Sequence, residues 1–239
     1  MFFNLTKNYN QFICSIGNDV IAGPFKGMKY ILKSIGSCYM PKILGIYEKE
    51  LYPTLTKFLS TSDMCINIGA AEGYYAIGCA LKFPKLQVIA YEMDERGREC
   101  MLELKNINLV NNVKIKNKFT CLDFDSIQNI SNSRVTYLID IEGDEKHIFS
   151  QYYSHFNNSN FIIELHDEKS KSIETKLKHF FSDTHRIKTI PLKNKHINDL
   201  PIHIPLLLKL FKKELIYKHL ISEWRQYDQS FLICEPKFE

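Results

Sequence analysis

Two apolar runs in this sequence lead into side chains that can exchange protons or bind a metal ion. The first run continues into Asp140 and Glu142, and the second contains Glu164 and continues into His166 and Asp167. Histidine ionises near neutral pH, which suits His166 to the role of general base. Alternatively, Asp140 and Glu164 with His166 or Asp167 could hold Mg²⁺, a hard ion that would acidify a bound hydroxyl. A structural role for His166, as a cap at the end of a strand, is the third interpretation.

A loop of small residues comes earlier in the chain. In CINIGAAEGYY at 65–75 an apolar run ends on Gly69, and Gly73 opens a predicted helix. A second apolar run ends on Glu92. Small residues let a ligand approach the backbone closely, a helix N-terminus favours an anionic group, and an acid at the next strand end suits ribose hydroxyls. This layout predicts a site for a nucleoside cofactor.

The spacing of the small residues distinguishes between cofactors. A dinucleotide fingerprint needs glycines in G-x-G-x-x-G order, but Ala71 and Tyr74 occupy the second and third glycine positions. The pattern G-x-A-x-G instead resembles motif I of class I S-adenosylmethionine-dependent methyltransferases. A nicotinamide-dependent oxidoreductase is therefore the less favoured enzyme class.

Short apolar runs alternate with amphipathic segments from about residue 64, which is typical of βαβ units and a mostly parallel sheet. A helix is expected after the second strand, capped by Asp94, with an apolar face of Met101, Leu102, Leu104 and Leu109. The seven predicted strands span 64–69, 87–92, 113–119, 135–141, 160–165, 186–191 and 230–235. We therefore expect an α/β fold with a Rossmann-like, seven-stranded sheet flanked by helices, as in class I methyltransferases.

Two further regions surround this sheet. Residues 1–60 form an N-terminal extension, with a predicted hairpin at 23–30 and a segment at 41–51 that begins extended and becomes helical near Tyr47. The extension either covers a sheet edge or closes over the active site of the domain at 61–239. In the second case Tyr47 and Glu48 would contact substrate.

Before the last strand, residues 192–226 form a predicted helical insertion. Its stretch at 204–225 is basic and amphipathic, which suits packing on its own domain, contact in a homodimer, or an anionic membrane surface.

The composition limits the partners and the compartment. The 239 residues are 45% hydrophobic and 24% charged with a net charge of +4, and no apolar stretch is long enough to span a membrane. A mild charge without a basic stripe argues against nucleic acid as the partner. The seven cysteines are scattered and form no C-x-x-C motif. We expect reduced thiols and a cytoplasmic location.

Several motifs together resemble the FkbM-type branch of class I methyltransferases. They are NIGAAEGYYA at 67–76, VIAYEMD at 88–94, LDFDSI at 122–127, LIDIEGDE at 138–145 and IELHD at 163–167. The resemblance covers about residues 40–170. The first motif has Asn67 where many class I enzymes have Asp, and Glu72 adds an acid that would lie near the methionine amine of the cofactor or face solvent.

This resemblance implies which residues bind the cofactor S-adenosylmethionine. Glu92 would bind the ribose and Asp123 would lie near the adenine. The expected cofactor-binding residues are Asn67, Gly69, Ala71, Glu72, Gly73, Tyr74, Glu92, Met93, Asp123 and Asp140.

We predict an S-adenosylmethionine-dependent O-methyltransferase that acts on a hydroxyl of a sugar or similar small acceptor, with surface polysaccharide synthesis as the implied setting. His166, Asp140 and Glu164 would act as base or bind Mg²⁺, and Glu142 and Asp167 would contact the acceptor. N-methylation of a small molecule and a non-catalytic, methyltransferase-like partner subunit are the alternatives.

Overall fold

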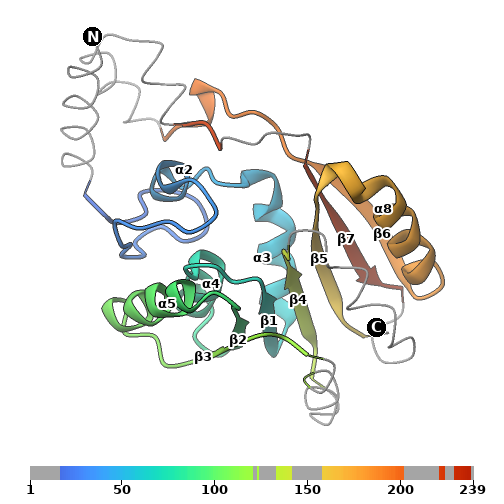
Figure 1. The fold of residues 1–239 in the computed structure, drawn as a ribbon, viewed down its shortest axis with the longest axis horizontal. Helices are drawn as coiled ribbons and strands as arrows, with labels where there is room; N and C mark the ends of the chain where they lie inside the picture. The colour runs from blue at the N-terminus through green and yellow to red at the C-terminus, as the bar shows by residue number, and fades with distance from the viewer. Residues whose placement is uncertain are drawn as a thin grey trace.

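The chain folds around one seven-stranded sheet. The computed structural model describes residues 17–120, 123, 133–141, 158–201, 221–223 and 229–237. The strand order is β3-β2-β1-β4-β5-β7-β6 (Figure 1). β7 runs antiparallel to β5 and β6, and the other neighbouring pairs are parallel. The strands are β1 (Met64–Ile68), β2 (Gln87–Tyr91), β3 (Val113–Lys116), β4 (Val135–Ile139), β5 (Asn160–Leu165), β6 (His185–Pro191) and β7 (Ser230–Pro236).

The central strands are the most apolar ones. Every residue of β1 and β4 is buried, as expected for parallel strands covered on both faces. The predicted sheet is confirmed, with all seven strands at their expected places. The prediction of the third strand was too long, because β3 ends at Lys116 and residues 117–120 form a loop.

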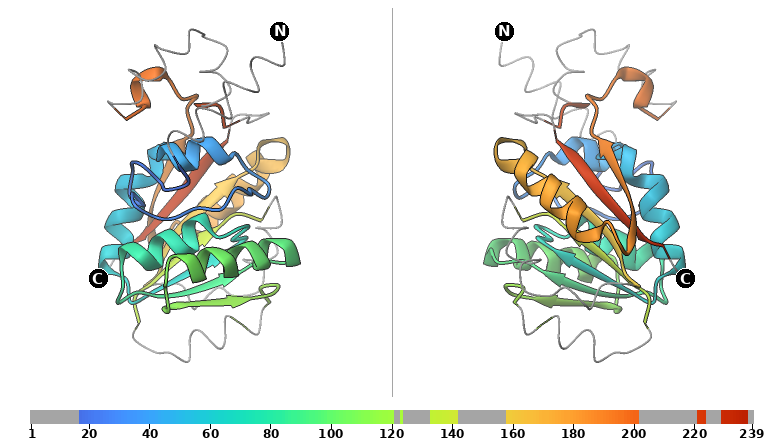
Figure 2. Two further views of the ribbon diagram at one scale, coloured as in Figure 1. Left: turned by 90° about the vertical axis from the view of Figure 1, so that its left-hand side faces the viewer. Right: turned by 90° about the vertical axis from the view of Figure 1, so that its right-hand side faces the viewer.

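Helices cover both faces of the sheet. One core joins the sheet to α3 (Tyr52–Thr61), α4 (Tyr74–Lys82), α5 (Glu95–Ile107) and the N-terminal extension. The other core joins the opposite face to α8 (Asp167–Phe181). Figure 2 shows α8 and α5 on opposite sides of the strands. The two cores hold the strands rigidly, so that the carboxyl ends of the parallel strands keep fixed positions.

The predicted cap of α5 is confirmed, but half of its predicted apolar face is wrong. The side chain of Asp94 accepts a hydrogen bond from Arg96 N at 3.0 Å. Met101 and Leu104 are fully buried, whereas Leu102 is 51% and Leu109 84% exposed. Leu102 lies about 100° around the helix from Met101, and Leu109 follows the end of the helix in a left-handed conformation with φ of 54°.

The described part of the extension begins with a short antiparallel bridge between Asp19 and Lys29. Gly27 N donates to Val20 O at 2.7 Å, which closes the turn predicted at 23–30. The segment 41–51 was predicted to begin extended and to become helical near Tyr47, and this prediction was wrong. Its first residues already belong to a helix, α2 (Tyr39–Leu44). Gly45 ends this helix in a left-handed conformation with φ of 68°. Only glycine fits there, because a Cβ would lie 2.0 Å from Ala22 O.

Only the ends of the 192–226 insertion belong to the described part of the chain. They include a 3₁₀ turn, η2 (Ile197–Asp199), and the buried Ile221. Most of the basic amphipathic stretch at 204–225 lies outside the described residues. No helix among the described residues has the length and apolar character needed to cross a membrane. The described cysteines Cys38, Cys65, Cys79, Cys100 and Cys234 form no disulfide.

Candidate active site

The loop between β1 and α4 is built on backbone conformations that small residues adopt most easily. Gly69 has φ of 79°, and a Cβ there would lie 1.7 Å from Asp140 O, so only glycine fits between the ends of β1 and β4. Ala71 has φ of 48°, and its N–H donates to Glu92 Oε2 at 2.7 Å. Glu92 Oε1 also accepts from Asp94 N at 2.7 Å. The loop and the end of β2 are thereby held together by one carboxylate.

A cavity of about 640 Å³ lies beyond the carboxyl ends of the parallel strands. The β1–α4 loop, the end of β2, the loop after β3 and the ends of β4 and β5 all contribute to its wall. The extension supplies the remaining wall through Ile35, Gly36, Ser37, Lys42, Tyr47 and Glu48. In an open α/β sheet this edge is where ligands bind.

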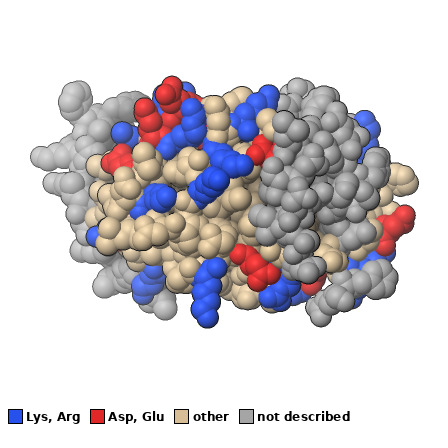
Figure 3. Space-filling view, turned by 90° about the horizontal axis from the view of Figure 1, so that it is seen from below, with Lys and Arg blue, Asp and Glu red and all other residues tan. Residues whose placement is uncertain are grey.

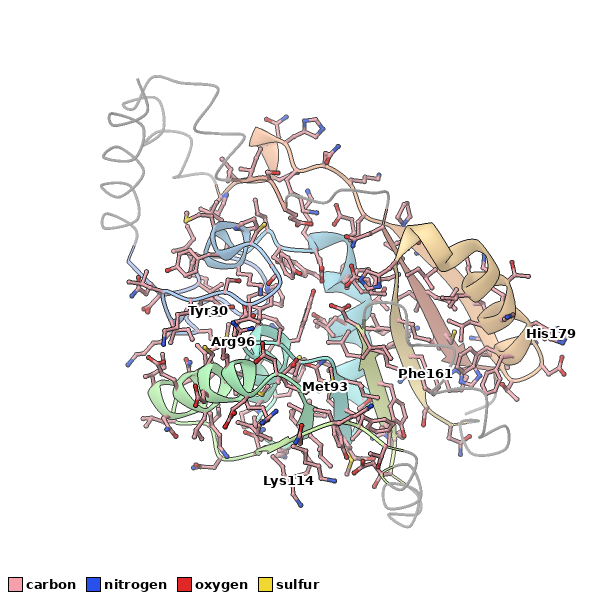
Figure 4. All side chains as sticks on the ribbon, in the orientation of Figure 1. Tyr30, Met93, Arg96, Lys114, Phe161 and His179 are labelled. Carbon is pink, nitrogen blue, oxygen red and sulfur yellow. The ribbon has the colours of Figure 1, made fainter. Side chains whose placement is uncertain are left out.

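Most of the predicted cofactor residues line this cavity. They are Asn67, Gly69, Ala71, Tyr74, Glu92, Met93 and Asp140. Met93, labelled in Figure 4, is 70% exposed just after β2. Asn67 is 2% exposed, and its Oδ1 has no hydrogen-bond partner among the described residues. A buried acceptor of this kind at a cavity wall suits a ligand that donates a hydrogen bond.

Three predicted cofactor residues have other surroundings. A Cβ on Gly73 would meet Met101 Cγ at 2.5 Å, so this glycine allows α4 and α5 to pack closely. Asp123 accepts hydrogen bonds from Lys116 Nζ and Tyr91 Oη, both at 2.9 Å. Burial alone would raise the pKa of Asp123, but the hydrogen bonds from Lys116 and Thr120 hold this pKa below its usual value. Glu72 is fully buried and contacts the extension instead of the cavity.

The predicted strand-end groups meet in space. One ligand atom each from Asp140, Glu164 and His166 lies within 4.8 Å of the others. His166 Nε2 is 3.4 Å from Asp140 Oδ1, and Glu164 is 4% exposed. Asp140 and Glu164 line the cavity, so the cluster lies at its edge. Such a set can take up a proton or hold a cation.

Two of the four predicted substrate residues, Tyr47 and Glu48, line the cavity. Glu48 is 1% exposed, has φ of 50° and accepts a hydrogen bond from Tyr75 Oη. Asp167 begins α8, and Glu142 lies outside the described residues.

The extension is also fastened to the insertion by buried charges. Lys195 Nζ lies 2.6 Å from Glu50 Oε2 and 3.2 Å from Glu223 Oε1. Glu223 Oε1 accepts a hydrogen bond from Glu48 N at 2.9 Å. Segments far apart in the sequence therefore meet behind Glu48, at the wall of the cavity.

Sequence reasoning missed several residues of the wall. Tyr75 and Phe231 each line the cavity as isolated residues. The segment 117–120 lines it with four consecutive residues, Asn117, Lys118, Phe119 and Thr120. That segment could have been found, because it follows β3 at its carboxyl end, but the strand predicted at 113–119 included its first three residues. The wall residues 35–37 and Lys42 carried no comparable signal.

Comparisons with known proteins show similarity at the level of the fold. No protein-family model and no curated protein matches the sequence. Among solved structures, an rRNA methylase from Streptococcus thermophilus is similar with a TM-score of 0.52 at 6% identity, over 78% of this chain and 96% of that one. The METTL16 methyltransferase domain also has a TM-score of 0.52, at 9% identity, over 78% of this chain and 66% of that one. The strand order with an antiparallel β7 and these similarities show the Rossmann-like fold of class I S-adenosylmethionine-dependent methyltransferases.

Proposed function

We propose that this protein is an O-methyltransferase that uses S-adenosylmethionine to methylate a hydroxyl of a sugar or a similar small acceptor. The observation that carries the proposal is one cavity lined by two different sets of residues. The small-residue loop and Glu92 are one set, and Asp140 and Glu164, which cluster with His166, are the other. The first set suits a nucleoside cofactor and the second suits the activation of a hydroxyl.

The residues of the first set fit S-adenosylmethionine. Each carboxylate oxygen of Glu92 accepts one backbone N–H and keeps a lone pair for a ribose hydroxyl. Asn67 Oδ1 is a buried acceptor that suits the methionine ammonium group. Phe119 and Met93 add an aromatic ring and a thioether to the wall, which suit the flat face of adenine. None of these interactions involves a pyrophosphate, a group that S-adenosylmethionine lacks.

When bound, S-adenosylmethionine supplies a methyl carbon that its sulfonium already activates. The protein must then align the acceptor and help remove its proton, and alignment alone can contribute about 7 kcal/mol or more. We assign the proton to the His166 imidazole, and Asp140 stabilises the resulting positive charge from 3.4 Å. Glu164 holds the acceptor hydroxyl at the buried side of the cluster.

A divalent cation is the second candidate for activating the hydroxyl. Asp140 and Glu164 supply the carboxylate oxygens that Mg²⁺ prefers, and an ion there would lower the pKa of a bound hydroxyl. His166 adds a nitrogen, which Mg²⁺ accepts less readily. Loss of turnover in chelator with recovery in Mg²⁺ would favour the metal, whereas turnover that is unaffected by chelator would favour His166 as base.

The choice of acceptor rests on the resemblance of the motifs to FkbM-type enzymes and on the mild net charge of +4, which does not favour nucleic acid as a substrate. On the face in Figure 3, basic and acidic side chains are interspersed among uncharged ones over the described residues. The scattered cysteines support a cytoplasmic reaction, and the stretch at 204–225 suits packing on its own domain or contact in a homodimer. N-methylation of a small molecule is the alternative, since a nitrogen acceptor needs less help from a base.

The first test is the melting temperature with S-adenosylhomocysteine and, in parallel, with NAD, each with and without Mg²⁺. A ligand at 100 times its dissociation constant stabilises the folded state by about 2.7 kcal/mol. We expect the melting temperature to rise with S-adenosylhomocysteine and not with NAD. A rise only with NAD would indicate an oxidoreductase, and no rise with either would indicate a non-catalytic subunit. Full turnover by folded His166→Ala and Asp140→Ala variants would contradict the assigned roles.

A further inference from the structure

Glu72 is a buried carboxylate inside the cofactor loop that does not face the cavity. Its side chain is fully buried and receives hydrogen bonds from Tyr30 Oη at 2.6 Å, Ser34 Oγ at 3.0 Å and Ile35 N at 3.1 Å. Lys42 Nζ completes the set with an ion pair to Oε1, and the Lys42 side chain is 3% exposed. All four donors belong to the extension. Figure 4 places Tyr30 in the segment before α2, on the side of α4 that faces α2.

The segment that supplies these donors is also a wall of the cavity. Ile35, Gly36, Ser37 and Lys42 line it, together with Gly69 and Ala71 of the cofactor loop. The neighbour of Glu72 on its N-terminal side is Ala71, whose N–H binds Glu92. One residue therefore lies between the backbone that would contact the cofactor and the wall that would cover it.

Lys42 extends the same arrangement to the aromatic wall. Its Nζ lies 5.0 Å from the ring centroid of Tyr47 and 5.5 Å from that of Tyr74. Both rings line the cavity and pack edge to face with centroids 5.6 Å apart. A cation held over two ring faces fixes their positions, and here the cation is itself held by Glu72.

From this geometry we propose that Glu72 is a positioning residue that fastens the wall 34–42 to the cofactor loop, so that wall and loop retain the bound cofactor as one unit. The inference rests on the proposed function, because it requires S-adenosylmethionine or its product in the cavity. The negative charge of Glu72 is essential, because Lys42 is too deeply buried to remain unpaired.

The test compares the full-length protein with Glu72→Gln by stopped-flow dissociation of S-adenosylhomocysteine. Glutamine keeps the size of the side chain but loses the ion pair, so the wall should open more often. We expect the dissociation rate to rise at least tenfold with little change in the association rate. The melting temperature should fall by roughly 6–20 °C. Glu103→Gln is the matched control, since Glu103 pairs with Lys33 at 3.9 Å on the surface and is 52% exposed.

A second variant separates positioning from stability. Glu72→Gln combined with Lys42→Met removes the unpaired buried cation and should recover most of the melting temperature. We expect its dissociation rate to remain raised, and the Ile35 amide to exchange hydrogen faster than in the natural protein. A dissociation rate that returns to the natural value together with the melting temperature would show a merely structural role and overturn the inference. If the natural protein does not bind S-adenosylhomocysteine at all, the proposed function fails with it.

Discussion

Single carboxylates have distinct tasks in this protein because their surroundings differ. Glu92 lines the cavity and orders the loop through two backbone N–H groups. Glu72 lies only one residue beyond Ala71 but is turned into the extension. Both acids are visible in the sequence, and only the first has a task that its strand-end position predicts.

Replacing Glu92 tests the ribose contact. Glu92→Ala removes the charged acceptor that we propose for two ribose hydroxyls, and each such hydrogen bond contributes about 1.5–3 kcal/mol. We expect the dissociation constant of S-adenosylhomocysteine to rise roughly 100-fold or more by titration calorimetry. Glu99→Ala on the exposed side of α5 is the control. Unchanged affinity in Glu92→Ala would place the cofactor elsewhere.

The acid stability of the protein should depend on Glu72. Burial alone would raise the pKa of Glu72, but the charge of Lys42 and the hydrogen bonds from Lys42 and Tyr30 outweigh it and lower this pKa below the ordinary value of 4.5. The unfolded state then binds more protons below that value, so stability falls as the pH falls. Denaturant unfolding between about pH 5 and about pH 3 should lose free energy more steeply in the natural protein than in Glu72→Gln. If the free energy of unfolding fell equally steeply with pH in both proteins, the lowered pKa of Glu72 would be contradicted.

At the scale of elements, the site depends on how closely the strand ends approach one another. Gly69 lets the end of β1 pass beside the Asp140 backbone at the end of β4. The sequence predicts these strands because both are continuous apolar runs, and it predicts the loop because glycine ends the first run. It does not predict α2, because this short helix ends at Gly45, which packs against Ala22 of the extension, and the sequence alone does not show that contact.

Two glycines with similar backbone angles should respond differently to alanine. Gly69 has φ of 79° and no room for a Cβ, whereas Gly27 has φ of 89° and nothing within 4 Å of a built Cβ. We expect Gly69→Ala to lower the free energy of unfolding by at least about 3 kcal/mol. Gly27→Ala should cost about 1–2 kcal/mol, from backbone strain alone. Similar losses in urea unfolding would show that crowding at β4 is unimportant.

At the scale of the whole molecule, the extension lines one cavity with the strand ends and also contacts the insertion. The extension contacts the cofactor loop through Glu72 and the insertion through Lys195. These contacts join residues distant in the sequence, and their side chains form no local pattern. This explains why the sheet and the strand-end cluster were predictable while the surrounding wall was not.

The last strand should be essential for the whole sheet. Phe231, Leu232 and Cys234 are at most 1% exposed, and burying three such side chains contributes roughly 5–9 kcal/mol. That is comparable to the total stability of a domain. A chain that ends at residue 229 should therefore lose its cooperative thermal unfolding transition, while one that ends at residue 237 keeps it. A cooperative transition in the shorter chain would contradict this role of β7.

The position of β7 also sets a delay during synthesis. β6 pairs with β7 alone, and β5 pairs with β7 on its outer side, so neither edge is complete until β7 has left the ribosome. The 38 residues at 192–229 separate β6 from β7. At about 5–20 residues per second, a nascent chain displays two unpaired strand edges for about 2–8 s. Such edges invite pairing with other chains, so this interval of synthesis favours aggregation of the growing chain.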